Sequence, residues 1–168
     1  MGVYRKYIRE YATTRKTDLS LLYSKPSVLK KLAADMAAPF VKKRITKVLA
    51  IEASGFVLGT AVALALGSGV VMIRKEGRTS WKTRRVSTKD YSGATSRLEL
   101  ITGVLSKKDR VLVVDDWSET GGQMLGAIRL AEQSGATVIG ATAVNMDDKA
   151  LKNKVLSKYI LHYVEHYR

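Results

Sequence analysis

The sequence predicts an α/β fold with a central parallel sheet flanked by helices. Two strand–helix–strand patterns follow one another along the chain, and each joins short apolar strands through one helix. Parallel strands that are joined by right-handed helical crossovers form a sheet covered on both faces. The chain has 168 residues, 46% of them hydrophobic, and neither proline lies in a linker, so we expect one domain over residues 1–168.

The first half of the chain contains an amphipathic helix and the first strand–helix–strand unit. Turn and capping signals at Asp18–Ser20 and Ser24–Ser27 precede the amphipathic helix. Its apolar positions follow helical spacing: Val28, Leu29, Leu32, Ala33, Met36 and Ala37. The unit that follows is expected to have a buried strand at 48–51, a helix at 55–66 and a second buried strand at 70–73.

Periodicity disappears between Arg74 and Ser96, where Gly77, Gly93 and many polar residues indicate a long loop or a weak hairpin. Order returns with a possible strand at 98–101. The second unit then has a strand at 111–114, a helix at 122–133 and a strand at 137–143. Ligands of such sheets collect at the carboxyl ends of the strands, which is where we look for a site.

The C-terminal segment, residues 146–168, is expected to be helical. His162 and His166 are four residues apart there, a spacing that can hold a metal ion on one face of a helix. Three tyrosines surround them: Tyr159, Tyr163 and Tyr167. This pattern favours an amphipathic helix that packs on the domain or on a second subunit.

An uncharged stretch of 21 residues, Ala53–Ile73, is long enough to cross a membrane. Gly67, Ser68 and Gly69 interrupt it, and its β-branched ends flank an Ala/Leu middle, which favours a buried strand–helix–strand layout instead. Residues 1–10 lack the apolar core of a secretory signal, and the absence of cysteine excludes disulfides and thiol catalysis. We expect a cytoplasmic protein without a membrane span.

The net charge of +14 is unevenly distributed along the chain. Residues 1–47 hold 12 Lys and Arg against 3 acids, and residues 74–110 hold 11 against 4. Such an excess attracts polyanions, including nucleic acid and small phosphorylated substrates. Aromatic residues alternate with cations near the N-terminus (Tyr4, Tyr7 and Tyr11 with Arg5, Lys6 and Arg9), a pattern able to stack on single-stranded nucleic acid or to cover the core. Nucleic-acid binding is possible but not favoured, because no short recognition module is present.

The most informative stretch runs from Val111 to Gln123. An apolar strand ends in Asp115 and Asp116, and a turn with Thr120 and two glycines then opens a helix. The first N–H groups of that helix suit a phosphate, since glycine lets the backbone approach an anion closely. The two carboxylates can bond sugar hydroxyls or orient Mg²⁺ through its waters. One loop could therefore hold a phosphorylated sugar, although an acidic pair that only caps a helix remains the structural alternative.

This string resembles the motif that binds phosphoribosyl pyrophosphate (PRPP) in the type I phosphoribosyltransferases. The resemblance covers roughly residues 17–145 and is strongest to adenine phosphoribosyltransferase-like proteins. It implies a small N-terminal hood over 1–45, a core over 46–145 and a flexible lid at about 75–96. Other segments that resemble the family are Thr17–Leu22 followed by Pro26, Ile51–Phe56, Ile73–Arg78 and Leu98–Leu100.

The resemblance also implies roles for individual residues. Asp115 and Asp116 would contact the ribose hydroxyls and Mg²⁺, directly or through water, and the PRPP-binding loop would comprise Asp115, Asp116, Ser118, Glu119, Thr120, Gly121, Gly122 and Gln123. The pyrophosphate would contact Ala53, Ser54, Gly55, Arg74 and Lys75. The chain departs from the family at three places: Ser54 stands where an arginine is usual, no Glu follows Tyr91, and Glu119 and Gln123 replace a small residue and a threonine.

Glu119 lies where the related hypoxanthine-guanine enzymes carry an acid beside the purine, so we expect it to be the catalytic acid or base. A carboxylate that only neutralises a neighbouring cation is the alternative. The resemblance implies an enzyme that transfers ribose 5-phosphate from PRPP to a nitrogenous base, a purine above all, and releases pyrophosphate. It also implies a homodimer. The competing hypothesis is a non-catalytic sensor of PRPP or nucleotides on the same fold, which Ser54 and the missing lid Glu favour.

Overall fold

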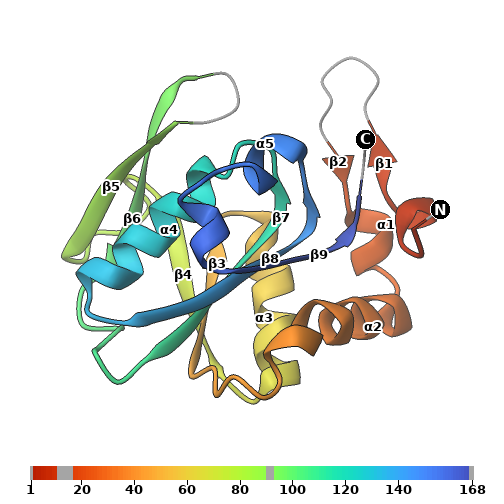
Figure 1. Cartoon of the computed structure of the whole chain (residues 1–168), viewed down its shortest axis with the longest axis horizontal. Helices are drawn as coiled ribbons and strands as arrows, with labels where there is room; N and C mark the ends of the chain where they lie inside the picture. Colours follow the sequence, from red (N-terminus) through yellow and green to blue (C-terminus); the bar gives the residue numbers. More distant parts are fainter. Residues whose placement is uncertain (1, 11–16, 90–92, 167–168) are drawn as a thin grey trace.

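The computed structural model describes residues 2–10, 17–89 and 93–166, and within them a seven-stranded sheet has the order β5-β6-β4-β3-β7-β8-β9 (Figure 1). The parallel part comprises β4 (Gly69–Lys75), β3 (Lys47–Ile51), β7 (Arg110–Ser118), β8 (Thr137–Met146) and β9 (Ile160–Glu165). The remaining two strands, β5 (Thr83–Lys89) and β6 (Thr95–Ile101), form an antiparallel hairpin, and β6 pairs with the end of β4. The predicted fold class is confirmed.

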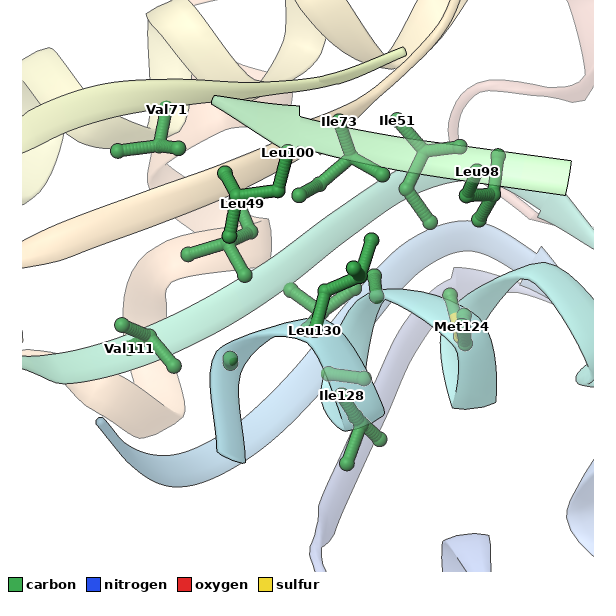
Figure 2. Close-up of a cluster of buried hydrophobic side chains, with 14 of the residues drawn as sticks. Leu49, Ile51, Val71, Ile73, Leu98, Leu100, Val111, Met124, Ile128 and Leu130 are labelled. Carbon is green, nitrogen blue, oxygen red and sulfur yellow. The ribbon is translucent and has the colours of Figure 1, made fainter. Parts of the chain in front are cut away.

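Helices cover both faces of the sheet. Helix α4 (Gly122–Gln133) lies on one face, and α2 (Pro26–Ala37) and α3 (Ser54–Leu66) lie on the other (Figure 1). Alternate side chains of the central strands point to opposite faces: Leu49 and Val113 pack on the α4 side, and Val48 and Leu112 pack on the α2/α3 side. Figure 2 shows Leu49 in the cluster on the α4 side. Because both faces are buried, β3 and β7 have uninterrupted apolar sequences.

The N-terminal part contains short elements and one long helix. The short elements are η1 (Arg5–Tyr7), β1 (Arg9–Glu10), β2 (Thr17–Asp18), α1 (Ser20–Tyr23) and η2 (Ala38–Phe40). Helix α2, predicted from its apolar spacing, packs against α3 through Leu32 and Met36, so it belongs to the core as much as to a hood. Tyr4 is buried and therefore covers the core, while Tyr11 lies outside the described residues.

The span predicted as a lid, 75–96, was expected to be a long loop or a weak hairpin, and in its described part it contains the hairpin strand β5 and the start of β6. Its strands pair from Thr83 with Ile101 to Lys89 with Thr95. The alternation of β5 was hidden because Val86 is its one apolar residue, and in β6 the buried Leu98 and Leu100 flank the charged Glu99. Residues 90–92 lie outside the described structure. The position after Tyr91, where the sequence lacks the Glu of the resembled family, is one of them. The flexibility of this span stays a prediction.

The hairpin packs directly onto α4 at two glycines. A Cβ on Gly126 would lie 2.3 Å from Cγ2 of Thr88, and a Cβ on Gly122 would lie 2.2 Å from the carbonyl oxygen of Lys89. Distances under 3.0 Å are shorter than real Cβ contacts, so side chains larger than glycine at these places would push the hairpin away. The end of β5 is thereby held against the first turn of α4.

The helix predicted for residues 146–168 is wrong for its second half. Only α5 (Asp148–Leu151) and the single turn η3 (Leu156–Lys158) are helical, and Ile160–Glu165 is β9, which extends the sheet beside β8. Leu161 and Tyr163 pack on the α4 side and Val164 on the opposite side. This is the period of two of a strand, which the i, i+4 histidine spacing obscured.

The strand also removes the metal alternative for His162 and His166. Four residues of extended chain span about 13 Å, too far for two imidazoles to share one ion. His162 Nε2 lies 3.0 Å from the carbonyl oxygen of Asp35, and His166 Nε2 lies 4.0 Å from a carboxylate oxygen of Asp148. Within the described residues no group of three or more His, Cys, Asp or Glu side chains is arranged to hold a metal ion.

No helix in the described part of the chain is long and apolar enough to cross a membrane. The apolar stretch 53–73 instead forms the 13-residue helix α3 and most of β4, separated by Gly67 in a left-handed conformation (φ +64°). The strand–helix–strand interpretation of this stretch is confirmed.

The cations occupy two different settings. In the hairpin they pair with acids: Arg85 lies 3.5 Å from both Glu76 and the buried Glu99, and Arg97 lies 3.4 Å from Glu76. The cations of 42–47 and 107–110 meet at the amino ends of β3 and β7, where the Thr46 N–H donates to the Arg110 carbonyl. That edge is opposite the carboxyl ends of the strands. Nucleic-acid binding there stays a prediction that we do not favour.

Candidate active site

The two predicted carboxylates lie near the end of β7, the strand beside β3 at the centre of the sheet. Asp115 is buried and only 5% exposed, whereas Asp116 is half-buried. The Asp116 N–H donates to Oδ1 of Asp115 at 2.9 Å, and the Trp117 N–H donates to Oδ1 of Asp116 at 2.9 Å. Both carboxylates are thus oriented by the backbone that follows them.

Burial, the negative charge of Asp116 and a hydrogen bond with that residue raise the pKa of Asp115 well above its ordinary value of 3.8. The N–H of Asp116 and the positive charge of Lys75 oppose this shift only in part. Ionised Asp115 is therefore a group whose pKa would fall if hydroxyl donors or a cation approached it. Carboxylates with a strongly perturbed pKa at a strand end are typical of functional sites.

The turn between β7 and α4 is the place where the sequence predicts an anion site. Gly121 has φ +79°, the left-handed region that glycine adopts without strain, and α4 begins at the next residue. The N-cap residue of α4, Gly121, has no side chain to cap the helix, and the Gly122 N–H donates a 3.3 Å bond to the Thr120 hydroxyl. The first amides of α4 and the helix dipole therefore face the cleft beside this turn.

That cleft is lined by seven of the predicted residues and by two others. The predicted ones are Asp115, Ser118, Glu119, Thr120, Gly121, Gly122 and Gln123, and the additional ones are Trp117 and Lys89. Asp116 does not line this cleft. Glu119 is half-buried at its wall.

The predicted pyrophosphate residues lie next to the cleft rather than in it. Ser54 begins α3 directly after Ala53, and a Cβ on Gly55 would lie 3.2 Å from the Val114 carbonyl and 3.4 Å from Oδ1 of Asp115. The loop after β3 therefore touches β7 at the buried carboxylate. The parallel register of β3 and β7 brings it there, since Ala50 is opposite Val114.

Arg74 and Lys75 lie at the end of β4, on the other side of β3. The Lys75 N–H donates to Oε2 of Glu52 at 2.8 Å, which fixes the two strand ends together. The Arg74 guanidinium lies 5.8 Å from the centroid of the Phe56 ring. Lys75 is close enough to Asp115 to lower its pKa, so a cation and an acid face the same region.

Sequence reasoning missed two residues at this site. Lys89 comes from the hairpin, where nothing in the sequence distinguishes it from the other cations of that span. Tyr23 comes from α1, and its buried hydroxyl lies beside Ser54, Asp115 and Asp116 without a hydrogen-bond partner in the described structure. The one signal in the sequence is that Tyr23 directly follows the segment Thr17–Leu22, which resembles the family.

Comparisons with known proteins agree with this geometry. A family model described as a phosphoribosyl transferase domain matches residues 23–165. The adenine phosphoribosyltransferase of Nitrosococcus oceani is 36% identical over 150 residues, which cover 89% of this chain and 87% of that protein.

Solved structures give the same result. The crystal structure of adenine phosphoribosyltransferase from Rhodothermus marinus has a TM-score of 0.89 at 29% identity and covers 97% of this chain and 96% of that one. The Giardia lamblia enzyme, complexed with 9-deazaadenine, has a TM-score of 0.84 at 27% identity, with 96% and 93% covered.

The non-catalytic alternative gains no support from these relatives, because those described above are named as transferases. The fold, the cleft at the end of β7 and the matched residues 23–165 lead to one conclusion: the chain belongs to the phosphoribosyl transferase domain family and is a phosphoribosyltransferase, an enzyme that transfers ribose 5-phosphate from PRPP to a nitrogenous base.

Proposed function

We propose that this enzyme uses adenine as its base and forms the nucleoside monophosphate with release of pyrophosphate. The observation that carries the reaction class is the glycine turn Thr120–Gly122 at the start of α4, which lines the same cleft as Asp115. The choice of adenine rests on the relatives, since they are named adenine phosphoribosyltransferases and one of them binds 9-deazaadenine.

In this proposal each part of the site holds one part of PRPP. The amides of Gly121 to Gln123 and the Thr120 hydroxyl bind the 5′-phosphate, with Ser118 and Glu119 beside them. Asp115 and Asp116 accept hydrogen bonds from the ribose hydroxyls. Ala53 to Gly55, with Arg74 and Lys75, contact the pyrophosphate. The contact between Gly55 and Asp115 supports this layout, because it places the pyrophosphate loop next to the ribose site.

The residues fit a magnesium ion that is brought by the substrate. Mg²⁺ is usually bound by one or two carboxylates together with substrate phosphates, and Asp115 and Asp116 provide two carboxylates, of which the first is buried beside a like charge. When bound, Mg²⁺ would neutralise charge on the leaving pyrophosphate. The chain itself supplies orientation: the α4 turn fixes the sugar phosphate, and the carboxylates fix the ribose ring.

The transition state has cation-like character at the sugar carbon, so water must be kept away from it. The hairpin β5–β6 is the natural lid, because Lys89 lines the cleft and its carbonyl touches Gly122. Positioning and electrostatic stabilisation then account for most of the rate enhancement.

The base assignment is tested by following pyrophosphate release with PRPP, Mg²⁺ and one base at a time: adenine, guanine, hypoxanthine, xanthine, uracil and orotate. We expect adenine to exceed every other base by about a hundredfold in kcat/KM, since unmatched polar groups in a base pocket are strongly rejected. A preference for another base would overturn the assignment. Intact PRPP binding with no turnover on any base would instead support the sensor.

Replacing Glu119 by Gln is expected to lower kcat with adenine by about a hundredfold, because positioned acid–base groups contribute at least that factor. The dissociation constant of PRPP should stay unchanged, since Gln keeps the shape of the cleft wall. The matched control is Glu132→Gln at the other end of α4, where the carboxylate accepts a bond from the Tyr159 hydroxyl. A loss of less than threefold for Glu119→Gln would remove the acid–base role.

Ligand should protect the lid from proteolysis. With PRPP and Mg²⁺ at ten times the PRPP dissociation constant, we expect tryptic cleavage at Lys82, Arg84 and Lys89 to slow by about tenfold. Cleavage at Lys152 and Lys154, outside the site, serves as the internal control. Equal protection of the lid with and without ligand would contradict its role.

We further propose a cytoplasmic homodimer. Helix α3 is apolar nearly all round, yet Leu64 and Val57 on it are 79% and 42% exposed, and Val70 and Met72 of the neighbouring β4 are 39% and 44% exposed. A helix that is apolar on every side is normally buried, so a second copy packed on the α3/β4 face would cover it. The cytoplasmic assignment rests on the absence of cysteine from a chain of this size.

A further inference from the structure

Tyr23 is the last residue of α1 and is held firmly beside the site. Its N–H donates to the Leu19 carbonyl at 2.9 Å, and Leu19 and Leu22 are buried in the α2/α3-side cluster. Pro26 starts α2 three residues later, so the chain has little freedom on either side of Tyr23. The ring packs on the same cluster, and the hydroxyl at its end is the one polar atom of the side chain.

The Tyr23 hydroxyl is buried and has no hydrogen-bond partner in the described structure. The Ser54 hydroxyl lies beside it but does not form a bond of normal geometry with it, and both site carboxylates are near enough to act on its charge. An unsatisfied buried hydroxyl is unfavourable, and it is retained in native proteins where it serves a purpose that a static fold does not show.

Two features of the surroundings decide what this hydroxyl binds. Ser54 belongs to the loop assigned to the pyrophosphate, and it stands where the resembled enzymes carry an arginine, so this loop has one cationic donor fewer. Burial and the two aspartates raise the pKa of Tyr23, so its hydroxyl stays protonated and acts as a donor. A donor suits the anionic oxygens of pyrophosphate, whereas the ribose hydroxyls already match the carboxylates.

We propose that the Tyr23 hydroxyl, together with that of Ser54, donates hydrogen bonds to the pyrophosphate of PRPP and replaces the missing arginine contact. The inference rests on the proposed PRPP-binding site and adds a residue from the N-terminal hood to it. Tyr23 is a binding residue for the leaving group and takes no proton from the base.

The test is the variant Tyr23→Phe, measured with the Mg²⁺ complexes of PRPP and of inorganic pyrophosphate, and with ribose 5-phosphate, by titration calorimetry. Loss of a hydrogen bond to a charged group predicts dissociation constants for PRPP and pyrophosphate about tenfold or more above those of the parent. Binding of ribose 5-phosphate should be unchanged. The melting temperature without ligand should stay equal or rise, since the substitution removes an unsatisfied hydroxyl.

Tyr159→Phe is the matched control. It removes a phenol that donates to Oε1 of Glu132 at 2.6 Å, far from the pyrophosphate loop, so it should lower the melting temperature slightly and leave all three affinities unchanged. Ser54→Ala provides a second variant, and its effect on pyrophosphate should be less than additive with that of Tyr23→Phe, because the two hydroxyls share one ligand.

The outcomes separate this inference from the proposed function. A parent that binds PRPP, together with a Tyr23→Phe variant within twofold of it, overturns the inference and leaves the proposed function standing. Weaker binding of ribose 5-phosphate but not of pyrophosphate also overturns it, since the hydroxyl would then face the sugar. A parent that does not bind PRPP overturns both.

Discussion

Replacing Asp115 by Asn is expected to lower kcat/KM for PRPP at least a hundredfold and to raise the melting temperature of the ligand-free protein at neutral pH. The loss of activity follows because a preorganised polar contact to the reacting sugar typically contributes about a hundredfold. The gain in stability follows because ionised Asp115 is buried beside Asp116, and the positive charge of Lys75 offsets that cost only in part. Asparagine keeps the shape and carries no charge.

The pH dependence of stability gives an independent check on Asp115. Its pKa is raised in the folded protein, so the folded state binds its proton more tightly than the unfolded chain does. The stabilisation from this group is fully present below about pH 3.8 and is lost as pH rises through the folded pKa. The melting-temperature difference between Asp115→Asn and the parent should therefore grow from acidic to neutral pH. A difference independent of pH would contradict the raised pKa.

Asp109→Asn is the control with the opposite sign. Burial raises the pKa of Asp109, but bonds from Ser106 and Thr46 outweigh it and the pKa lies below 3.8. The stabilisation from Asp109 is therefore present above its unfolded pKa and lost as pH falls through the folded value. This variant should lose stability at neutral pH and keep full activity, because Asp109 precedes β7 at the end away from the cleft.

Gly121→Ala is expected to lower the free energy of unfolding by about 2 kcal/mol and to weaken PRPP binding by at least about tenfold. The φ angle of +79° is strained for alanine, and the added Cβ would lie 2.3 Å from Cδ1 of Leu156. Moving Leu156 or the turn would displace the amides that face the phosphate. Chemical unfolding and calorimetric titration with PRPP measure the two effects.

Gly103→Ala separates backbone strain from the contact. Gly103 has a similar φ of +86°, but nothing lies within 4 Å of its Cβ position. This variant should lose only about 1 kcal/mol and bind PRPP normally. Equal losses for the two variants would show that the Leu156 contact is unimportant.

The sequence predicted the parts of the fold that have one dominant local signal. Helix α4 begins at Gly122 and ends at Gln133 as expected, because its apolar face and the preceding glycines leave little ambiguity. The strands β3 and β7 were recognised for the same reason, since burial on both faces makes them continuously apolar. The loop between Asp115 and Gln123 could be located because it connects a strand and a helix that the sequence itself predicts.

What the sequence did not predict depends on tertiary neighbours. Strand β9 carries half-buried polar and aromatic residues whose spacing also fits a helix, and only pairing with β8 selects the extended form. The hairpin β5–β6 was predicted only as the alternative to a loop, because its strands are rich in Arg, Ser and Thr and are defined by their pairing with each other. Tyr23 lies more than 90 residues before Asp115 in the sequence. Local sequence patterns cannot predict that the two residues come close together.

The Lys89 carbonyl occupies the space where any side chain at position 122 would begin. The turn proposed to bind the sugar phosphate and the end of β5, part of the proposed lid, are thus in direct contact at Gly122. A larger residue at position 122 would therefore change the affinity only by displacing the hairpin, because its Cβ would overlap the Lys89 carbonyl. Substitutions that change the substrate preference are therefore expected at the neighbouring positions whose side chains line the cleft.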